Sequence, residues 1–245
     1  MNQFHTLPED QPMLHTDIDL TPPQLIVFDW DGTLVQSTGH IVRSFELAIA
    51  HSNLPTLAPE AIQSIIGLGL VEACQTLYPE LSLEQAQALG KTYQQFYFSR
   101  TDVLETYTGA ETLLKDLRDA GCWLAIATGK SNRGLHEALE ETGLGHYFLG
   151  TRTAEQTASK PSPLMLMELL DEFGLEPAQA WMIGDTDFDL LMAHNAGCTP
   201  IAITHGAHES ERLHAAKPTA VIHDLPSLLT LYQSATSKHK VSQNA

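Results

Sequence analysis

The chain has 245 residues, 43% of them hydrophobic, which predicts a globular protein with one large domain or one domain plus an insertion. Its 30 acidic residues against 13 lysines and arginines give a formal net charge of −17. Because nucleic acids and anionic membranes bind basic surfaces, this charge argues against both as partners. The three cysteines form no zinc-type pair, so we expect reduced, buried thiols in a cytoplasmic protein.

The first segment, residues 1–20, is acidic, contains prolines and has no apolar stretch of the kind found in secretory signals or membrane spans. We expect it to be a flexible extension. The next residues, Leu25–Phe28, form a short continuous apolar run, which predicts a strand buried on both faces.

Two acids follow this strand directly. Side chains alternate along an extended chain, so Asp29 and Asp31 point to the same side and Trp30 to the opposite one. An Asx turn that closes a strand is the simplest explanation of a single Asp-Gly pair. The full Asp-Trp-Asp-Gly-Thr pattern is much rarer, and ligands bind at strand ends in such sheets, so we interpret both acids as catalytic.

Residues 37–105 show helical patterns and no convincing strand pattern, which predicts an inserted helical domain. The helices are expected over 41–50, 61–66, 71–77 and 83–98, and Ser82 with Gln85 forms a capping box at the start of the last one. Gly67 and Gly69 lie between two of these helices. They are either a helix-breaking connector or a loop that brings backbone amides to a substrate.

From residue 106 to residue 233 strands and helices alternate, which predicts an α/β fold with a doubly wound parallel sheet. Strands are expected over 122–127, 180–183, 200–204 and 220–223, and helices over 164–173, 188–196 and 226–232. A capping box of Thr108 and Glu111 predicts one more helix before the first of these strands. Residues 234–245 are polar and are expected to be disordered.

Polar residues follow several of these segments. Thr128 ends the second apolar run, Lys160 lies in a Ser-Lys-Pro loop, and an acidic cluster, residues 184–189, follows the third run. Taken singly, each has an ordinary explanation as a helix cap or a solvated loop residue, and for Asp187 a cap is the better one. His205, His208 and His214 come after the cluster and are expected at the surface.

Taken in order, these motifs resemble those of the haloacid dehalogenase superfamily of phosphotransferases. The family's Asp-x-Asp-Gly-Thr motif matches residues 29–33, its Ser or Thr matches Thr128, its Lys matches Lys160, and its Gly-Asp-x-x-x-Asp motif matches residues 184–189. The segment 107–109 before a helix is similar to the phosphoglycolate phosphatase-like branch. The resemblance implies a Rossmann-like core, residues 21–36 and 106–233, and a helical cap, residues 37–105.

Trp30 departs from the family pattern, because relatives usually carry a smaller apolar residue there. We expect this difference to change the packing beside the first acid and to leave the chemistry unchanged.

The acids that the fold would gather require a cation. Each pair of carboxylates about 4 Å apart costs on the order of 4 kcal/mol at an effective dielectric near 20. Oxygen ligands that share an ion with a phosphate favour Mg²⁺. The resemblance implies that the side chains of Asp29 and Asp185 and the backbone carbonyl of Asp31 bind this ion, and that Asp189 holds Lys160.

The chemistry that follows is phosphoryl transfer. Asp29 attacks phosphorus and forms an aspartyl-phosphate, and Asp31 first protonates the leaving alkoxide and then activates water. Thr128, the amides near Gly32 and Lys160 stabilise the phosphoryl oxygens. Other residues are expected to bind the substrate, with Arg43 or Lys130 pairing with a carboxylate or a second phosphate: Arg43, Gly67, Gly69, Gly129 and Lys130.

The motifs thus predict a magnesium-dependent phosphatase, monomeric or homodimeric, that acts on a small phosphorylated metabolite such as phosphoglycolate. A phosphomutase of the beta-phosphoglucomutase type is the alternative, followed by a pyrophosphatase or a 5'-nucleotidase on the same core. A dehalogenase would not need the leaving-group acid Asp31. A non-catalytic phosphate binder predicts that some of the four motifs are lost, yet all are intact.

Overall fold

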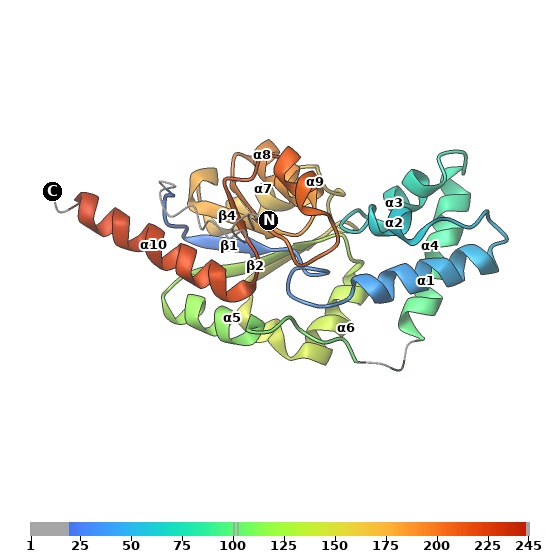
Figure 1. The fold of residues 1–245 in the computed structure, drawn as a ribbon, viewed down its shortest axis with the longest axis horizontal. Helices are drawn as coiled ribbons and strands as arrows, with labels where there is room; N and C mark the ends of the chain where they lie inside the picture. Colours follow the sequence, from blue (N-terminus) through green and yellow to red (C-terminus); the bar gives the residue numbers. More distant parts are fainter. Residues whose placement is uncertain (1–19, 100, 102, 244–245) are drawn as a thin grey trace, which may run out of the picture.

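The computed structural model describes residues 20–99, 101 and 103–243. The predicted extension therefore lies outside the described residues, except for Leu20, which is buried. Within this range six strands form one sheet, helices cover both of its faces, and a helical unit projects from one end (Figure 1). None of the helices in this part of the chain combines the length and the apolarity that a membrane span requires.

The sheet is parallel throughout, with the order β3-β2-β1-β4-β5-β6. Phe28, the last residue of β1, pairs with Ile126 of β2 on one side and with Ile183 of β4 on the other. The strand order reverses between β1 and β4, which is where ligands bind in doubly wound sheets. The strands are β1 Leu25–Phe28, β2 Trp123–Thr128, β3 Gly150–Thr153, β4 Ala180–Gly184, β5 Thr199–Ile203 and β6 Ala220–Ile222.

Successive residues of β1 enter different apolar clusters. Ile26 and Phe28 pack with α5, α6 and α10 on one face, whereas Leu25 and Val27 pack with α7 and α8 on the other. This alternation explains why the run is apolar at every position and confirms a strand buried on both sides. The core helices are α5 Ala110–Asp119, α6 Asn132–Thr142, α7 Leu164–Phe173, α8 Asp187–Ala196, α9 Ser210–Ala215 and α10 Leu225–Gln243, with 3-10 turns at Leu144–Tyr147 and Pro177–Gln179.

Four helices between β1 and α5 form the projecting unit and have an apolar cluster of their own (Figure 1). They are α1 Thr38–His51, α2 Pro59–Gln63, α3 Leu70–Leu77 and α4 Leu83–Phe98. The predicted capping box opens α4, with both of its hydrogen bonds between Ser82 and Gln85 present. The fold class predicted from the sequence, a doubly wound α/β core with an inserted helical cap, is confirmed.

Two elements differ from the prediction in the middle of the chain. Strand β3 was not predicted because its Gly-Thr-Arg-Thr sequence has no apolar run, and as an edge strand it pairs with β2 alone. The predicted capping box of Thr108 is wrong, since Gly109 is the N-cap of α5, with a φ of +85° that favours glycine, and no side chain caps the helix.

The predicted disorder of residues 234–245 is wrong for residues 234–243, which continue helix α10. Leu228, Tyr232 and Ala235 are spaced four and three residues apart, and all three are buried in the cluster that contains α5. This spacing keeps one apolar face along the helix, so packing overcomes the polar composition. Residues 244–245 lie outside the described part of the chain.

Candidate active site

The carboxyl ends of β1, β2 and β4 bring the predicted polar residues to one place. Asp29 and Asp31 follow β1, Thr128 ends β2, and Asp185 follows β4. Asp31 is 7% exposed and the other three are at most 1% exposed. Trp30 points the opposite way, as alternation requires, and packs edge-on to Phe148 in the core with ring centroids 6.3 Å apart.

Lys160 lies between two of the acids. Its Nζ is 2.7 Å from Asp29 Oδ1 and 2.6 Å from Asp189 Oδ1, and all three side chains are buried. Burial lowers the pKa of Lys160, but Asp189 and Asp29 outweigh this effect, so its pKa lies above the usual value for lysine. The ammonium therefore stays charged at neutral pH.

The first turn of α8 fixes Asp189. Thr186 is the N-cap, and its backbone amide and hydroxyl donate to Asp189 Oδ2 at 3.2 and 2.6 Å. This arrangement leaves Oδ1 of Asp189 to bind Lys160. A Cβ at Gly184 would overlap the Asp189 side chain, so the end of β4 must be a glycine for this acid to turn inward.

Asp185 is held by hydrogen bonds to both of its carboxylate oxygens. Thr33 Oγ1 donates to Oδ1 at 2.7 Å, and the backbone amide of Ala207 donates to Oδ2 at 2.6 Å. A Cβ at Gly32 would overlap this carboxylate, which explains why the turn after Asp31 contains glycine, here with a φ of +78°. The turn therefore brings the backbone of the first motif against the fourth.

Asp29, Asp185 and Asp189 form the group that could hold a metal ion, each offering an oxygen within 4.8 Å of the others. Burial raises the pKa of Asp29 well above its usual range, and burial with the nearby Asp189 raises the pKa of Asp185 to about 6. Within the described residues Asp29 Oδ2 accepts no hydrogen bond. Three carboxyl groups lie beside one ammonium, and one carboxylate oxygen has no partner, so the group fits a divalent cation. Such a cation would lower the pKa values of Asp29 and Asp185.

Asp31 has different neighbours from Asp29, and its side chain is not part of the metal group. Ser37 Oγ donates to Asp31 Oδ1 at 2.6 Å, and Lys130 Nζ lies 2.9 Å from the same oxygen. Lys130 also donates to the hydroxyl of Tyr97, on α4 of the cap, at 2.9 Å. Burial lowers the pKa of Lys130, yet Asp31 and Tyr97 raise it more, so the Lys130 ammonium stays charged at neutral pH.

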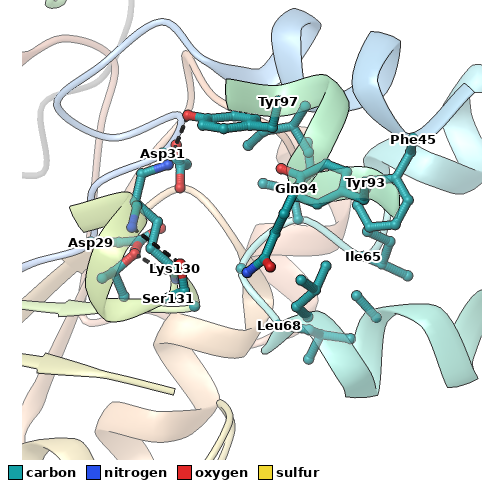
Figure 2. Close-up of a pocket in the computed structure, with 18 of the residues that line it drawn as sticks. Asp29, Asp31, Phe45, Ile65, Leu68, Tyr93, Gln94, Tyr97, Lys130 and Ser131 are labelled. Carbon is teal, nitrogen blue, oxygen red and sulfur yellow. Dashed lines mark hydrogen bonds and ion pairs between the residues drawn. The ribbon is translucent and has the colours of Figure 1, made fainter. Parts of the chain in front are cut away.

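A cavity lies between the core and the cap. Asp29, Asp31 and Thr128 line it from the core, and side chains of α1 and α4 and of the loop before α3 line it from the cap (Figure 2). Its volume is about 70 Å³, enough for several water molecules or a small alcohol group. The cavity therefore opens directly onto both acids of the first motif.

Only some of the predicted substrate-binding residues line the cavity. Gly67, Gly129 and Lys130 line the cavity, whereas the amide of Gly69 donates to Ser159 Oγ of the core at 2.7 Å. Arg43 is exposed and lies in a different hollow with Gln36 and Glu105, so it does not line the cavity, and its contact with the substrate stays a prediction. Arg43 lies outside the cavity because it and the cavity-lining Phe45 point to different sides of α1.

Asp187 lies outside the catalytic group. Its carboxylate receives two hydrogen bonds from Arg212 of α9, at 2.8 and 2.9 Å, and lies 3.2 Å from His208 Nδ1. Burial would raise the pKa of Asp187, but the bonds from His208 and Arg212 lower it to about 2. The expectation of a surface histidine is wrong for His208, which is 5% exposed and whose Nε2 lies 3.1 Å from the carbonyl of Ser64 in the cap.

Sequence reasoning missed two groups of residues around the site. Tyr93 and Tyr97 line the cavity from α4, and their spacing of four residues on an amphipathic helix is a signal that could have found them. His208 and Arg212 contact Ser64 across the cap and the core, and no local pattern marks such a long-range contact.

Comparisons with known proteins agree with this site. A model of the haloacid dehalogenase-like hydrolase family matches residues 26–203. The chain is 31% identical over 226 residues to phosphoglycolate phosphatase from Pasteurella multocida, covering 87% of this chain and 100% of that protein. It is 35% identical over 205 residues to the "Probable phosphatase IndB" of Dickeya dadantii, covering 81% of this chain and 88% of that protein.

A solved structure has the same architecture. The crystal structure of a "predicted phosphoglycolate phosphatase" from Haemophilus somnus is 26% identical and matches with a TM-score of 0.78 over 86% of this chain and 98% of that chain. The resemblance inferred from the four motifs is thereby confirmed. The chain belongs to the haloacid dehalogenase-like hydrolase family, in its phosphoglycolate phosphatase-like branch.

Proposed function

We propose that this enzyme is a magnesium-dependent phosphatase that hydrolyses a small phosphate monoester through an aspartyl-phosphate. The observation that carries the proposal is the environment of Asp29, whose carboxylate lines the cavity beside Lys160 and has one oxygen without a hydrogen bond among the described residues. A buried carboxylate with a fixed counter-ion and an open side is suited to nucleophilic attack.

Hydrolysis proceeds in two displacements. A carboxylate oxygen of Asp29 attacks phosphorus, the bond from phosphorus to the alcohol oxygen breaks, and protonated Asp31 gives its proton to that oxygen. Asp31, now a carboxylate, takes a proton from water as the water oxygen attacks the phosphorus of the aspartyl-phosphate. The bond between phosphorus and the Asp29 oxygen breaks, inorganic phosphate leaves, and both acids return to their starting states.

The remaining residues stabilise charge on the phosphoryl group. Lys160, fixed by Asp189, supplies a positive charge beside the attacked phosphorus. Thr128 is fully buried at the end of β2 and lines the cavity, so its hydroxyl can donate to a phosphoryl oxygen. Asp29, Asp185 and the backbone carbonyl of Asp31 would hold Mg²⁺, which neutralises the substrate's charge when bound.

The proposal is tested with p-nitrophenyl phosphate and phosphoglycolate, the substrate named for the Pasteurella multocida relative. With Mg²⁺ we expect the wild type to release phosphate and Asp29→Asn to lose about 10³-fold or more of kcat, because the amide keeps the shape but is no nucleophile. Asp187→Asn makes the same chemical change outside the catalytic group and should remain active.

A second measurement identifies the intermediate. Acid quenching during turnover followed by peptide mass spectrometry should find phosphate on Asp29 of the wild type and not on the variant. An active Asp29→Asn enzyme, or turnover without a phosphorylated Asp29, would contradict the proposed mechanism. Conversion of a sugar phosphate to its isomer without phosphate release would instead support the mutase.

A further inference from the structure

The cap side of the cavity carries no charge in the described part of the chain. Twelve residues from 41 to 98 line it, and none is an Asp, Glu, Lys, Arg or His. Six of them are labelled in the close-up and face the acids of the core (Figure 2): Phe45, Ile65, Leu68, Tyr93, Gln94 and Tyr97. The part of the substrate that enters this side therefore meets apolar and neutral polar groups.

On the core side, the two lysines nearest this space already have partners among the described residues. Lys160 is bound by Asp29 and Asp189, and Lys130 lies 2.9 Å from Asp31 while it donates to Tyr97. A carboxylate on the alcohol part of the ester would have to compete with Asp31 and Tyr97 for Lys130 or lie unpaired against apolar side chains. Burying an unpaired charge is strongly unfavourable.

Four aromatic side chains belong to the apolar surface: Phe45, Tyr93, Tyr97 and Phe98. The rings of Phe45 and Tyr93 are stacked with centroids 4.2 Å apart and an interplanar angle of 29°. Tyr97 continues this surface, with its ring centroid 5.6 Å from that of Tyr93. Contact with such a surface favours a flat or apolar group, because its burial removes hydrocarbon area from water.

Two neutral polar groups interrupt this surface. The Gln94 side chain extends into the cavity toward the core, and within the described residues neither its amide nor the Tyr93 hydroxyl has a hydrogen-bond partner (Figure 2). Burial, with Tyr97 and Asp31 nearby, raises the pKa of Tyr93, so its hydroxyl stays protonated and can donate. Gln94 can donate and accept. These groups suit a substrate with a neutral hydrogen-bonding group.

We infer that the substrate is a phosphate monoester whose alcohol part is uncharged and largely apolar, carries a neutral group that hydrogen-bonds to Gln94, and lies against Phe45 and Tyr93. This inference rests on the proposed phosphatase function and narrows it. In the reaction the ester bond to phosphorus breaks, water supplies the new oxygen on phosphate, and the alcohol leaves neutral with the proton from Asp31. Phosphoglycolate, whose alcohol part bears a carboxylate, is then a poor substrate.

Two matched pairs of esters test the inference. Phosphoglycolate and its primary amide have the same chain length and differ in charge, and propyl phosphate and methyl phosphate differ in apolar length. We expect kcat/KM to be at least about tenfold higher for the amide than for phosphoglycolate, and at least about tenfold higher for propyl than for methyl phosphate.

Two variants test whether the side chains of the cavity cause this preference for an uncharged ester. Gln94→Lys adds a cation where the leaving group lies, so the ratio of kcat/KM for the amide to that for phosphoglycolate should fall by at least about tenfold. Gln95→Lys adds the same charge to the neighbouring exposed position of α4, outside the cavity, and should keep the wild-type ratio. Thermal unfolding of both variants shows whether each is folded.

The outcomes separate the two proposals. If p-nitrophenyl phosphate is hydrolysed and phosphoglycolate exceeds its amide, or if Gln94→Lys and Gln95→Lys have equal ratios, the inference is overturned while the phosphatase function stands. If no ester releases phosphate in the presence of Mg²⁺, the phosphatase function is overturned, and the inference with it.

Discussion

At the scale of single residues, the two acids of the first motif show how position decides role. Asp29 and Asp31 come from one short segment and line one cavity, yet their neighbours differ. Asp29 contacts Lys160 and belongs to the group that could bind a metal, whereas Asp31 contacts Ser37 and Lys130 beside the cap. These surroundings support the proposed roles, attack on phosphorus for Asp29 and proton transfer to the leaving group for Asp31.

This difference predicts the behaviour of Asp31→Asn. Asp29 can still attack, so an ester with a good leaving group should lose much less activity in the first step than an alkyl ester. Water is no longer activated, so the aspartyl-phosphate should accumulate. Rapid-quench measurement of the burst with p-nitrophenyl and ethyl phosphates checks both effects. Equal losses for the two esters, with no trapped intermediate, would falsify the acid and base role of Asp31.

At the scale of elements, the first turn of α8 contains two acids with different tasks. Asp189 turns inward and holds Lys160, and Asp187 turns outward and binds Arg212 of α9. Arg212 also donates to the carbonyl of Ser64, and Gln63 of α2 donates to the carbonyl of Ala207. The start of α8 therefore joins the catalytic group, α9 and the cap.

Asp187→Ala should lower the free energy of unfolding by about 1–2 kcal/mol at pH 7. The substitution removes a partly exposed ion pair in which Arg212 donates two hydrogen bonds to Asp187. The pKa of Asp187 is lowered to about 2 in the folded protein. Its contribution is thus fully present above the unfolded pKa near 4 and is lost as the pH falls toward 2. Urea unfolding at several pH values measures this difference.

The comparison variant for this experiment is Lys115→Ala, which removes an exposed pair with Asp119 on α5. It should cost little at any pH. A penalty for Asp187→Ala that grows between pH 4 and pH 2, or that equals the small penalty of Lys115→Ala at pH 7, would show that the contacts of Asp187 do not stabilise the fold.

Elements with a local signal could be predicted from the sequence. The apolar run of β1 and the capping box of α4 were predicted with their bounds, because burial on both faces and a Ser-x-x-Gln pattern act over a few residues. Strand β3 gives no such signal, because Arg152 binds Glu168 and Glu172 of α7 and the strand is held by these contacts and by β2.

The residues of the active site, too, could be predicted only where a sequence motif marks them. The motifs predicted which residues gather at the strand ends, because their order along the chain follows the order of strands in a known fold. The partners of Lys130 could not be predicted, since Asp31 and Tyr97 lie far from it in sequence and Tyr97 belongs to the cap. Which side of α1 faces the cavity could not be predicted either, and Arg43 lies in a different hollow.

At the scale of the whole molecule, the chain is strongly acidic, with a net charge of −17, and its site buries three acids beside one lysine, two more than that lysine can balance. A cation bound there would have two effects: it would neutralise charge on an anionic substrate, and it would relieve repulsion in the folded state.

Removal of the metal should accordingly change activity and stability together. Chelation should abolish turnover, Mg²⁺ should restore it, and Ca²⁺ should not support it, because Ca²⁺ adopts a looser geometry with more ligands. Mg²⁺ should also raise the Tm of the wild type by more than that of Asp185→Asn, which lacks one candidate ligand. Activity after exhaustive chelation, or equal shifts in Tm, would remove the ion from the mechanism.

The loop before α3 meets the core through its main chain. A Cβ at Gly129 would overlap the carbonyl oxygens of Gly67 and Leu68, and the amide of Gly69 binds Ser159. Side chains of α1 and α4 that face the cavity, such as Phe45 and Gln94, take no part in this contact. During divergence from a common ancestor, substitutions at these positions can therefore change which ester the enzyme prefers. The main-chain contact that holds the cap on the core is kept.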